Sequence, residues 1–201
     1  MSIKDATTQI EQSVHETSLK DVFVIERPTF KDERGSFHED FRLNELEIAL
    51  GEPVVIRQAN VSRNYEAGTL RGIHAAPWAK LVRAVVGTIQ VVVVDLRRES
   101  DTFGQVWTDM IGDNGRNASV WVPAHCGNAY MTLESGVAYA YDVTAEFQPD
   151  KEVSVCWNDP ELSIPWRFDK LPNSLRKPIL SPKDADSPTL RDVMSKGLLQ
   201  R

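Results

Sequence analysis

The amino-acid sequence predicts an all-β domain, an antiparallel sandwich or barrel with short helices at its flanks. From Val22 onward, short runs of β-branched and aromatic residues follow one another along the chain. Turn-forming pairs such as Gly87-Thr88 and Ser135-Gly136 separate these runs. Amphipathic helices do not alternate with the runs, so a parallel βαβ fold is excluded.

The runs define nine predicted strands. They span residues 22–25, 54–59, 80–86, 89–96, 105–111, 118–122, 129–133, 137–143 and 152–157. The run Val91–Val94 lacks the alternation of a half-buried strand, so both of its faces are expected to be covered. A second sheet or a second subunit would provide that cover, and deep burial within one sandwich explains the run as well.

Short helices are predicted on either side of the strand-rich region. Residues 43–50 carry good helix formers, and the Gly51 that follows suits a helix C-cap. Near the C-terminus, Ser187 is the expected N-cap and Pro188 the first helical residue. The apolar face of this second helix comprises Leu190, Val193, Met194 and Leu198.

The chain is predicted to have an N-terminal arm and one domain. Residues 1–18 are polar and only weakly periodic, and they form either a short helix through Ile10 and Val14 or a mobile arm. No internal repeat, low-complexity tract or linker follows. Residues 19–201 are therefore expected to be a single domain.

Composition excludes several classes of protein. The 201 residues are 41% hydrophobic and 26% charged, near the globular average, which argues against a disordered chain. The two cysteines, Cys126 and Cys156, are too few for a disulfide scaffold and indicate a reducing compartment. The net charge of −6 argues against nucleic acid as a partner. Neither a signal peptide nor an apolar run of about 20 residues is visible, so no membrane contact and a cytoplasmic location are expected.

Polar residues around a glycine form the most informative stretch. Arg71 and His74 lie on either side of Gly72, and Lys80 follows the histidine. In an extended strand, Leu70, Gly72 and His74 share one face, and Arg71 points to the other unless a bulge at Gly72 intervenes. A histidine and a lysine in one barrel mouth would supply a base and a cation for a developing oxyanion. A polar rim that faces solvent is an equally good interpretation.

Two further clusters have both a structural and a functional interpretation. In residues 31–39, Gly35 permits a tight turn between two strands and Arg34 could bind a phosphate, although a charged hairpin tip is the commoner use of such a sequence. Tyr139 and Tyr141 face the same side of a strand. Such a pair more often belongs to a core than to a catalytic site, unless one hydroxyl opens into a pocket.

Motifs for binding metals and common cofactors are missing from the sequence. It has no HxH, HxxxH or CxxC spacing, and the neighbours His125 and Cys126 would face opposite sides of a strand. It also lacks the G-x-S-x-G elbow, the P-loop and the G-x-G-x-x-G fingerprint. No metal and no cofactor are therefore expected.

Several ordered stretches of the chain can be compared with a known family. They are FKDERGSFHEDF (30–41), RQANVS (57–62), TLRGIH (69–74), AKLVRAVVGTI (79–89), VVDLRRESDTFG (93–104), VPAHCGNAY (122–130), YDVTAEFQP (141–149), WNDPELSIPW (157–166) and LSPKDADSPTLRDV (180–193). Together they resemble the dTDP-4-dehydrorhamnose 3,5-epimerase family over nearly the whole chain. The resemblance implies a metal-free, cupin-like antiparallel jelly-roll barrel that forms a homodimer.

The resemblance also implies the chemical roles of particular residues. His74 is the base that removes the proton next to a 4-keto group, and Asp184 orients and charges that histidine. Lys80 stabilises the enolate oxygen. Tyr141 returns a proton from the opposite face.

The implied substrate is a nucleotide-diphospho-4-keto-deoxysugar. Arg34 and Arg71 correspond to positions that hold the diphosphate, and Gln58 and Asn60 lie near the nucleotide or the sugar. The full set of implied binding residues is Arg34, Glu39, Gln58, Asn60, Arg71 and Asn128.

Departures from the family pattern surround the expected sugar site. Asn128 stands where the family usually has a histidine, and His125 lies three residues earlier. The stretch 75–79 (AAPWA) is several residues shorter than usual, and the second aromatic residue near the tyrosine is Phe147. These departures leave open which sugar is bound and whether C3, C5 or both are inverted.

The leading hypothesis is an epimerase that inverts C3, C5 or both of a nucleotide-linked 4-keto-6-deoxy sugar in deoxysugar biosynthesis. The alternatives are a 3,4-ketoisomerase on a similar substrate and a sugar-nucleotide-binding protein without activity. The implied base and acid favour a catalyst over a binding protein. The nucleobase stays open, since dTDP is the family default and CDP and GDP sugars are alternatives.

Overall fold

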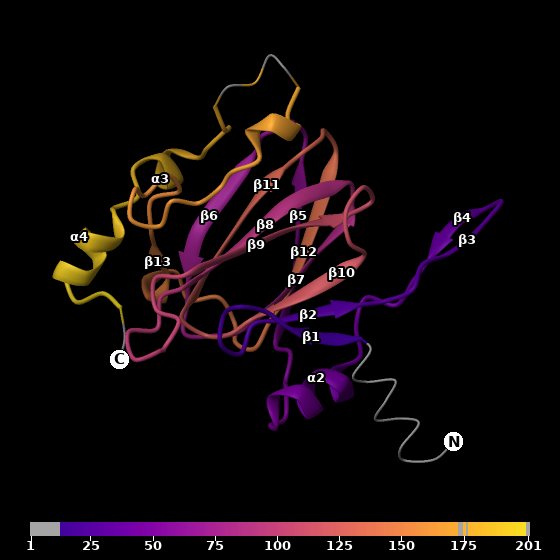
Figure 1. Cartoon of the computed structure of the whole chain (residues 1–201), viewed down its shortest axis with the longest axis horizontal. Coiled ribbons are helices and arrows are strands. Elements are labelled where there is room, and N and C mark those ends of the chain that lie inside the picture. The colour runs from indigo at the N-terminus through magenta and orange to yellow at the C-terminus, as the bar shows by residue number, and fades with distance from the viewer. Residues whose placement is uncertain (1–12, 173–174, 176, 200–201) are drawn as a thin grey trace.

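Two antiparallel β-sheets pack face to face in the computed structural model of the chain, and short helices lie at their edges (Figure 1). Side chains from both sheets fill the space between them. Val82 and Val120 come from one sheet, and Val91 and Ile111 from the other. The predicted all-β, antiparallel fold class is confirmed.

The structure describes residues 13–172, 175 and 177–199. One sheet has six strands in the order β1 (Val14–Glu16), β2 (Phe23–Glu26), β10 (Ala118–Val122), β7 (Lys80–Val86), β12 (Val137–Val143) and β5 (Gln58–Asn64). The other has five strands in the order β13 (Val153–Ser154), β6 (Leu70–Ala75), β11 (Cys126–Thr132), β8 (Thr88–Asp95) and β9 (Val106–Gly112). A separate hairpin pairs β3 (Phe30–Asp32) with β4 (Gly35–Phe37).

The predicted strands agree with the structure best in the middle of the chain. The strands at 80–86, 118–122 and 137–143 match at both ends. The predicted strand 54–59 is wrong in its first four residues, since β5 begins at Gln58 and Val54 packs beneath a helix. The predicted strand 152–157 shrinks to the two residues of β13.

The valine run in β8 is covered on both faces by its own chain. Val91 and Val93 face the six-stranded sheet, and Val92 and Val94 pack against the C-terminal part of the chain. The residues that cover this second face include Leu162, Leu190, Val193 and Leu199. All four valines are fully buried, so the run gives no evidence for a second subunit.

The predicted helix at 43–50 is confirmed as α2 (Leu43–Leu50), which ends at Gly51. The φ of Gly51 is 73°, a left-handed conformation that favours glycine, and its N–H donates to the Glu47 carbonyl at 2.9 Å. Helix α2 packs over the outer side of the six-stranded sheet through Leu46, which contacts the cluster around Trp121.

The second helix, α4 (Leu190–Ser195), starts later than predicted. Thr189, and not Ser187, is its N-cap, because Thr189 and Asp192 form a reciprocal capping box. The Ser187 hydroxyl donates instead to the Lys183 carbonyl at 3.0 Å. Of the predicted apolar face, Leu190 and Val193 are buried, whereas Met194 and Leu198 are exposed.

Part of the predicted N-terminal arm belongs to the sheet. Val14–Glu16 form β1, which pairs with β2, so a helix through Val14 is not present. Ile10 and the rest of residues 1–12 lie outside the described residues.

Short helical turns and the β3–β4 hairpin complete the fold. The turns are α3 (Pro182–Ala185), η1 (Pro149–Lys151) and η2 (Phe168–Lys170). The hairpin turns at Gly35, as the sequence predicted, and projects away from both sheets (Figure 1).

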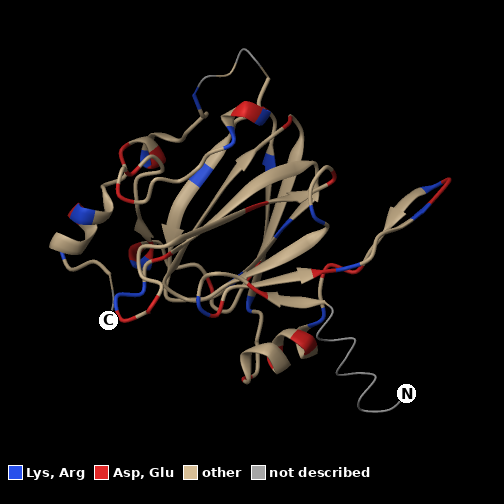
Figure 2. Ribbon diagram, in the orientation of Figure 1, with Lys and Arg blue, Asp and Glu red and all other residues tan. Residues whose placement is uncertain are grey.

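Basic and acidic residues are interspersed over the described ribbon (Figure 2). None of the helices among the described residues has the length and apolar character needed to cross a membrane.

Candidate functional site

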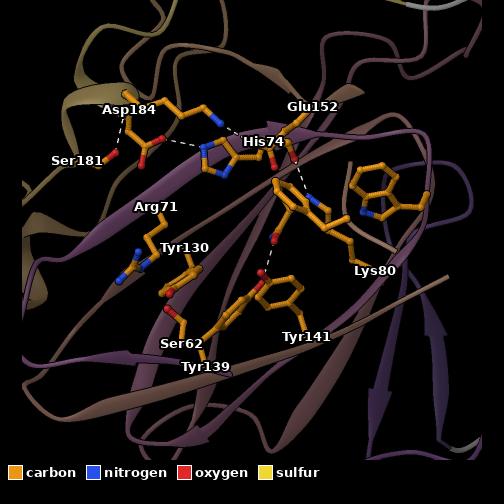
Figure 3. A pocket seen from close by; sticks show the side chains of 14 residues that line it. Ser62, Arg71, His74, Lys80, Tyr130, Tyr139, Tyr141, Glu152, Ser181 and Asp184 are labelled. Atoms are coloured by element: carbon orange, nitrogen blue, oxygen red, sulfur yellow. Dashed lines mark hydrogen bonds and ion pairs between the residues drawn. The ribbon is translucent and has the colours of Figure 1, made fainter. Parts of the chain in front are cut away.

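A cavity of about 260 Å³ lies between the two sheets. One side, the charged wall, carries His74, Lys80, Glu152, Lys183 and Asp184. The other side, the tyrosine wall, carries Tyr130, Tyr139 and Tyr141 (Figure 3). The two walls face each other, so a ligand between them would contact charged groups on one side and phenols on the other.

A bulge in β6 brings two polar residues into the cavity. Asn128 of β11 is paired with His74, and Tyr130 with Arg71, so three steps along β6 correspond to two along β11. Arg71 and His74 therefore both line the cavity. The sequence predicted that they would share a face only if a bulge occurred at Gly72, and the structure confirms that bulge. Gly72 lies within the bulge at a φ of 120°, and an added Cβ there would lie 2.7 Å from the Asn128 carbonyl oxygen, so only glycine fits.

His74 and Asp184 form a hydrogen-bonded pair. The Nε2 of His74 lies 2.7 Å from Oδ1 of Asp184, which leaves Nδ1 as the ring nitrogen not engaged by the carboxylate. Asp184 reaches this place on α3, whose N-cap Ser181 accepts the Asp184 backbone N–H at 3.1 Å. Burial opposes ionisation of Asp184, but hydrogen bonds, first of all with His74, hold the pKa of its carboxyl below the usual range. The carboxylate thus stays charged beside the imidazole.

Lys80 is buried at the base of the charged wall. Its Nζ donates to the His74 carbonyl oxygen at 3.0 Å. Burial lowers the pKa of Lys80 to about 8, Glu152 opposes this change, and Lys183 adds to it. Glu152 in turn accepts a hydrogen bond from Lys183 at 2.6 Å. Lys80 is therefore a cation near neutral pH whose charge depends on its neighbours.

The tyrosine wall contains two buried rings and one half-buried ring. Tyr130 and Tyr139 stack with centroids 3.9 Å apart, and the Tyr139 hydroxyl donates to Oδ1 of Asn128 at 2.8 Å. The Tyr141 hydroxyl makes no hydrogen bond to any of the described residues. Burial, and then the charge of Glu152, raises the pKa of Tyr141. Tyr139 is therefore part of the core, and Tyr141 presents a protonated hydroxyl to the cavity.

The predicted binding residues divide into three groups. Arg71 and Asn128 line the cavity, and Arg71 is held by Asn64, whose Oδ1 accepts from the arginine Nε at 3.0 Å. Gln58 and Asn60 lie just outside it on β5, where Asn60 pairs with Tyr141 across the strands. The Nε2 of Gln58 donates a hydrogen bond to Oδ1 of Asn60 at 2.6 Å.

Arg34 and Glu39 are not brought to this cavity. Arg34 lies at the tip of the β3–β4 hairpin with its side chain 90% exposed, and it pairs with Asp32 at 2.5 Å. Glu39 is also exposed and accepts from Arg42 at 2.8 Å. Both residues thus face solvent within a single chain.

Sequence reasoning missed several lining residues. Glu152 comes to His74 because β13 pairs with β6, with Ser154 opposite His74. The sequence predicted a strand at 152–157 but not its neighbour in the sheet. Trp78 lies in the unusually short 75–79 stretch and contacts Phe147 edge to face, with centroids 6.2 Å apart. Lys183 directly precedes Asp184, and this position was the only indication in the sequence that Lys183 lines the cavity. The described residues contain no group of three or more His, Cys, Asp or Glu side chains placed to hold a metal ion.

The sequence is similar to known epimerases over most of its length. A family model described as dTDP-4-dehydrorhamnose 3,5-epimerase matches residues 16–192. The dTDP-4-dehydrorhamnose 3,5-epimerase of Salmonella typhimurium is 36% identical over 186 residues, which cover 90% of this chain and 97% of that protein. The dTDP-4-dehydro-6-deoxyglucose 3-epimerase of Streptomyces bikiniensis is 34% identical over 190 residues, covering 92% and 93%.

Solved structures show the same fold. The rmlC epimerase of Mycobacterium tuberculosis superposes with a TM-score of 0.86 at 30% identity and covers 94% of both chains. A 3'-monoepimerase from Streptomyces bikiniensis, in complex with dTDP-quinovose, superposes with a TM-score of 0.82 at 33% identity, covering 92% of this chain and 91% of that one. These relatives include enzymes named for inversion at two carbons and at one.

Proposed function

Because the chain belongs to the dTDP-4-dehydrorhamnose 3,5-epimerase family, a family of isomerases, we propose that His74 and Tyr141 exchange protons with opposite faces of its sugar substrate. The substrate is a dTDP-linked 4-keto-6-deoxy sugar, inverted at C3, C5 or both. One observation carries the proposal: the His74–Asp184 pair lines one wall of the cavity, and the Tyr141 hydroxyl, which bonds none of the described residues, lines the opposite wall.

Proton removal needs both a base and a stabilised enolate. A carbon acid beside a ketone is too weak for imidazole unless negative charge on the enolate oxygen is stabilised as it forms. Nδ1 of His74 takes the proton, and Asp184 stabilises the resulting imidazolium through Nε2. The ammonium of Lys80, buried next to His74, is the cation for the enolate oxygen.

Proton return needs a separate acid, because inversion requires delivery to the face opposite the base. Tyr141 holds its proton firmly, since burial and the Glu152 charge raise its pKa. Its hydroxyl is directed to no protein acceptor among the described residues and is available to the enolate carbon. The whole reaction is redox-neutral, so its chemistry requires no dinucleotide cofactor.

The nucleotide is expected to extend from the sugar toward β5. Arg71 would hold the diphosphate, with its guanidinium oriented by Asn64. Asn60 lies on β5 at the level of Tyr141 and Gln58 lies beyond it, at the end of the strand away from Asn64, so both would contact the nucleotide or the sugar. The relative that holds dTDP-quinovose supports thymidine as the nucleoside. We expect the enzyme to act in the cytoplasm.

A homodimer belongs to the same proposal, because it gives Arg34 and Glu39 a place in the site. Their hairpin projects from the chain, and it exposes 62% of Phe30 and 69% of Phe37 to solvent (Figure 1). Apolar rings at such exposure are typical of a contact surface. In the dimer, the hairpin reaches the cavity of the second copy and Arg34 contacts the diphosphate there.

Complementation tests the dimer directly. Arg34→Ala and His74→Asn chains, each of low activity, are mixed and allowed to exchange subunits. If Arg34 acts across the interface, about half the dimers are mixed and each has one intact site, which restores about a quarter of the wild-type activity. If Arg34 acts within its own chain, mixing restores none. A monomer in light scattering at micromolar concentration would also reject this part of the proposal.

Solvent deuterium wash-in tests the catalytic proposal. The wild type, given a dTDP-4-keto-6-deoxy sugar in D₂O, should incorporate deuterium at C3, C5 or both, followed by NMR. His74→Asn should slow wash-in by about 10²–10⁴-fold, the usual cost of losing a general base, while dTDP still binds. A product whose carbonyl has moved to C3 would identify a ketoisomerase, and no incorporation by the wild type would indicate a binding protein.

A further inference from the structure

The Asn128 side chain is fixed in one orientation by the tyrosine wall. Asn128 is only 8% exposed, lines the cavity and is paired with His74 across two strands. Its Oδ1 accepts a hydrogen bond from the hydroxyl of Tyr139 at 2.8 Å. Tyr139 is 2% exposed and its ring stacks on Tyr130, so this hydroxyl cannot move away (Figure 3).

The direction of that bond decides what the carboxamide offers to a ligand. The amide nitrogen of Asn128 faces the carbonyl oxygens of Val92 and Ala129, which can only accept. The amide oxygen is therefore the atom that faces Tyr139, and the phenol donates to it. Oδ1 is then the acceptor, and the amide nitrogen points the other way. Nδ2 makes only long contacts, 3.4 Å each, with the carbonyl oxygens of Val92 and Ala129. It has the capacity to donate a shorter bond to a better acceptor.

We propose that Tyr139 is a positioning residue that holds Asn128 so that its NH₂ group donates to an oxygen of the sugar ring. The inference rests on the proposed function for the identity of the ligand and deepens it. Its consequence is selectivity: the Asn128–Tyr139 pair strengthens binding of a sugar nucleotide over that of the bare nucleotide. A carboxamide exchanges no proton at neutral pH, so Asn128 offers the sugar a hydrogen bond and neither an acid nor a base.

Binding measurements with two probes test the inference. Isothermal titration gives the Kd of dTDP-quinovose and of dTDP for the wild type, Tyr139→Phe, Asn128→Ala and the double variant. Each single variant should weaken dTDP-quinovose by about three- to tenfold, the effect of one neutral hydrogen bond, and leave dTDP within about twofold. Because Tyr139 acts through Asn128, the double variant should be no weaker than Asn128→Ala.

A matched control removes the same group from the neighbouring ring. The Tyr130 hydroxyl donates to Asn64, and not to Asn128, at 3.2 Å. Tyr130→Phe can affect Arg71 through Asn64, but both probes carry the diphosphate that Arg71 would hold. The variant should therefore leave the ratio of the two dissociation constants unchanged. Asn128→Asp supplies a further arm, since its carboxylate still accepts from Tyr139 but has no NH₂, and it should weaken dTDP-quinovose at least as much as Asn128→Ala.

Several results would overturn the inference. They are additive losses in the double variant, equal weakening of both probes, an altered ratio in Tyr130→Phe, or full sugar affinity in Asn128→Asp. If Tyr139→Phe does not fold, the Asn128→Ala and Asn128→Asp results still decide. Binding does not depend on which group moves the proton, so these measurements can fail while wash-in through His74 succeeds, and the reverse.

Discussion

The two walls of the cavity hold their protons by different means. On the charged wall, neighbouring side chains act together with burial. Hydrogen bonds, first of all with His74, keep Asp184 ionised although burial opposes it. Burial lowers the pKa of Lys80, and the charges of Glu152 and Lys183 adjust it. On the tyrosine wall, burial sets the charge, and the pKa of Tyr139 and of Tyr141 is raised chiefly by loss of solvent. The charged wall should therefore respond to substitutions of its partners, and the tyrosine wall to loss of single hydroxyls.

Among the substitutions that affect only one wall, removal of the Tyr141 hydroxyl should have the largest effect on the rate of inversion. Tyr141→Phe keeps the ring and its packing but removes the proton that would be returned. Deuterium should still enter the substrate through His74 and Lys80, while the inverted sugar should form about 100-fold more slowly. NMR of one sample follows both rates. Equal slowing of both would mean that Tyr141 positions the sugar, and unchanged inversion would mean that another group donates.

Neutralising Asp184 should have a smaller effect, confined to the charged wall. Asp184→Asn keeps the shape but cannot stabilise the imidazolium of His74, so we expect wash-in to slow by about tenfold or more. Inversion should slow in the same proportion, because the tyrosine wall is unchanged. An Asp184→Asn variant with wild-type wash-in would show that the hydrogen bond to His74 has no part in catalysis.

The pH dependence should reveal how Lys80 is tuned. Its active form is the ammonium, and its pKa is lowered to about 8, so the rate should fall as pH rises through this value. Glu152 raises that pKa and Lys183 lowers it. Glu152→Gln should therefore move the alkaline limb to lower pH, with about two- to fivefold less activity at pH 8 relative to pH 7.

Lys183→Met is the control of opposite sign, because it removes the repulsion and should move the limb to higher pH. Shifts of both variants in the same direction would contradict this account of Lys80. The measurement is kcat against pH from 6 to 10 for the wild type, Glu152→Gln and Lys183→Met.

Removal of metal ions is expected to have no effect on the rate of the reaction. Dialysis against EDTA is expected to leave the rate unchanged, because each proposed step uses a side chain of the two walls. Loss of turnover that a divalent ion restores would overturn both the expected roles and the comparison between the walls.

The sequence predicted the fold more fully than the site. Strands with uninterrupted β-branched runs, such as the one that contains Val91–Val94, were recognised because the pattern of apolar residues reflects burial. β6 was not, since Arg71, Gly72 and His74 interrupt the apolar pattern where the strand lines the cavity. Thr189 was missed as a helix cap because Ser187-Pro188 offered a competing signal, although Asp192 stood in the position of a capping box.

For the site, local spacing related His74 to Arg71 and to Lys80. Asp184 and the role of Tyr141 entered through the family resemblance, because no local pattern reports a contact made across the fold. Glu152 was missed for the same physical reason, since only the pairing of β13 with β6 brings it to the cavity. Arg34 was expected at the diphosphate, and a single chain leaves it in solvent.

The distance along the chain between His74 and Asp184 has a consequence for biosynthesis. The two residues are 110 positions apart, so at translation rates of about 5–20 residues per second the ribosome adds Asp184 roughly 6–22 s after His74. Every strand is synthesised before α3 and α4, and until these emerge Val92 and Val94 lack the cover of Leu190 and Val193. The nascent chain therefore passes through an interval in which its sheets are complete, one apolar face is open to chaperones or to aggregation, and catalysis has not begun.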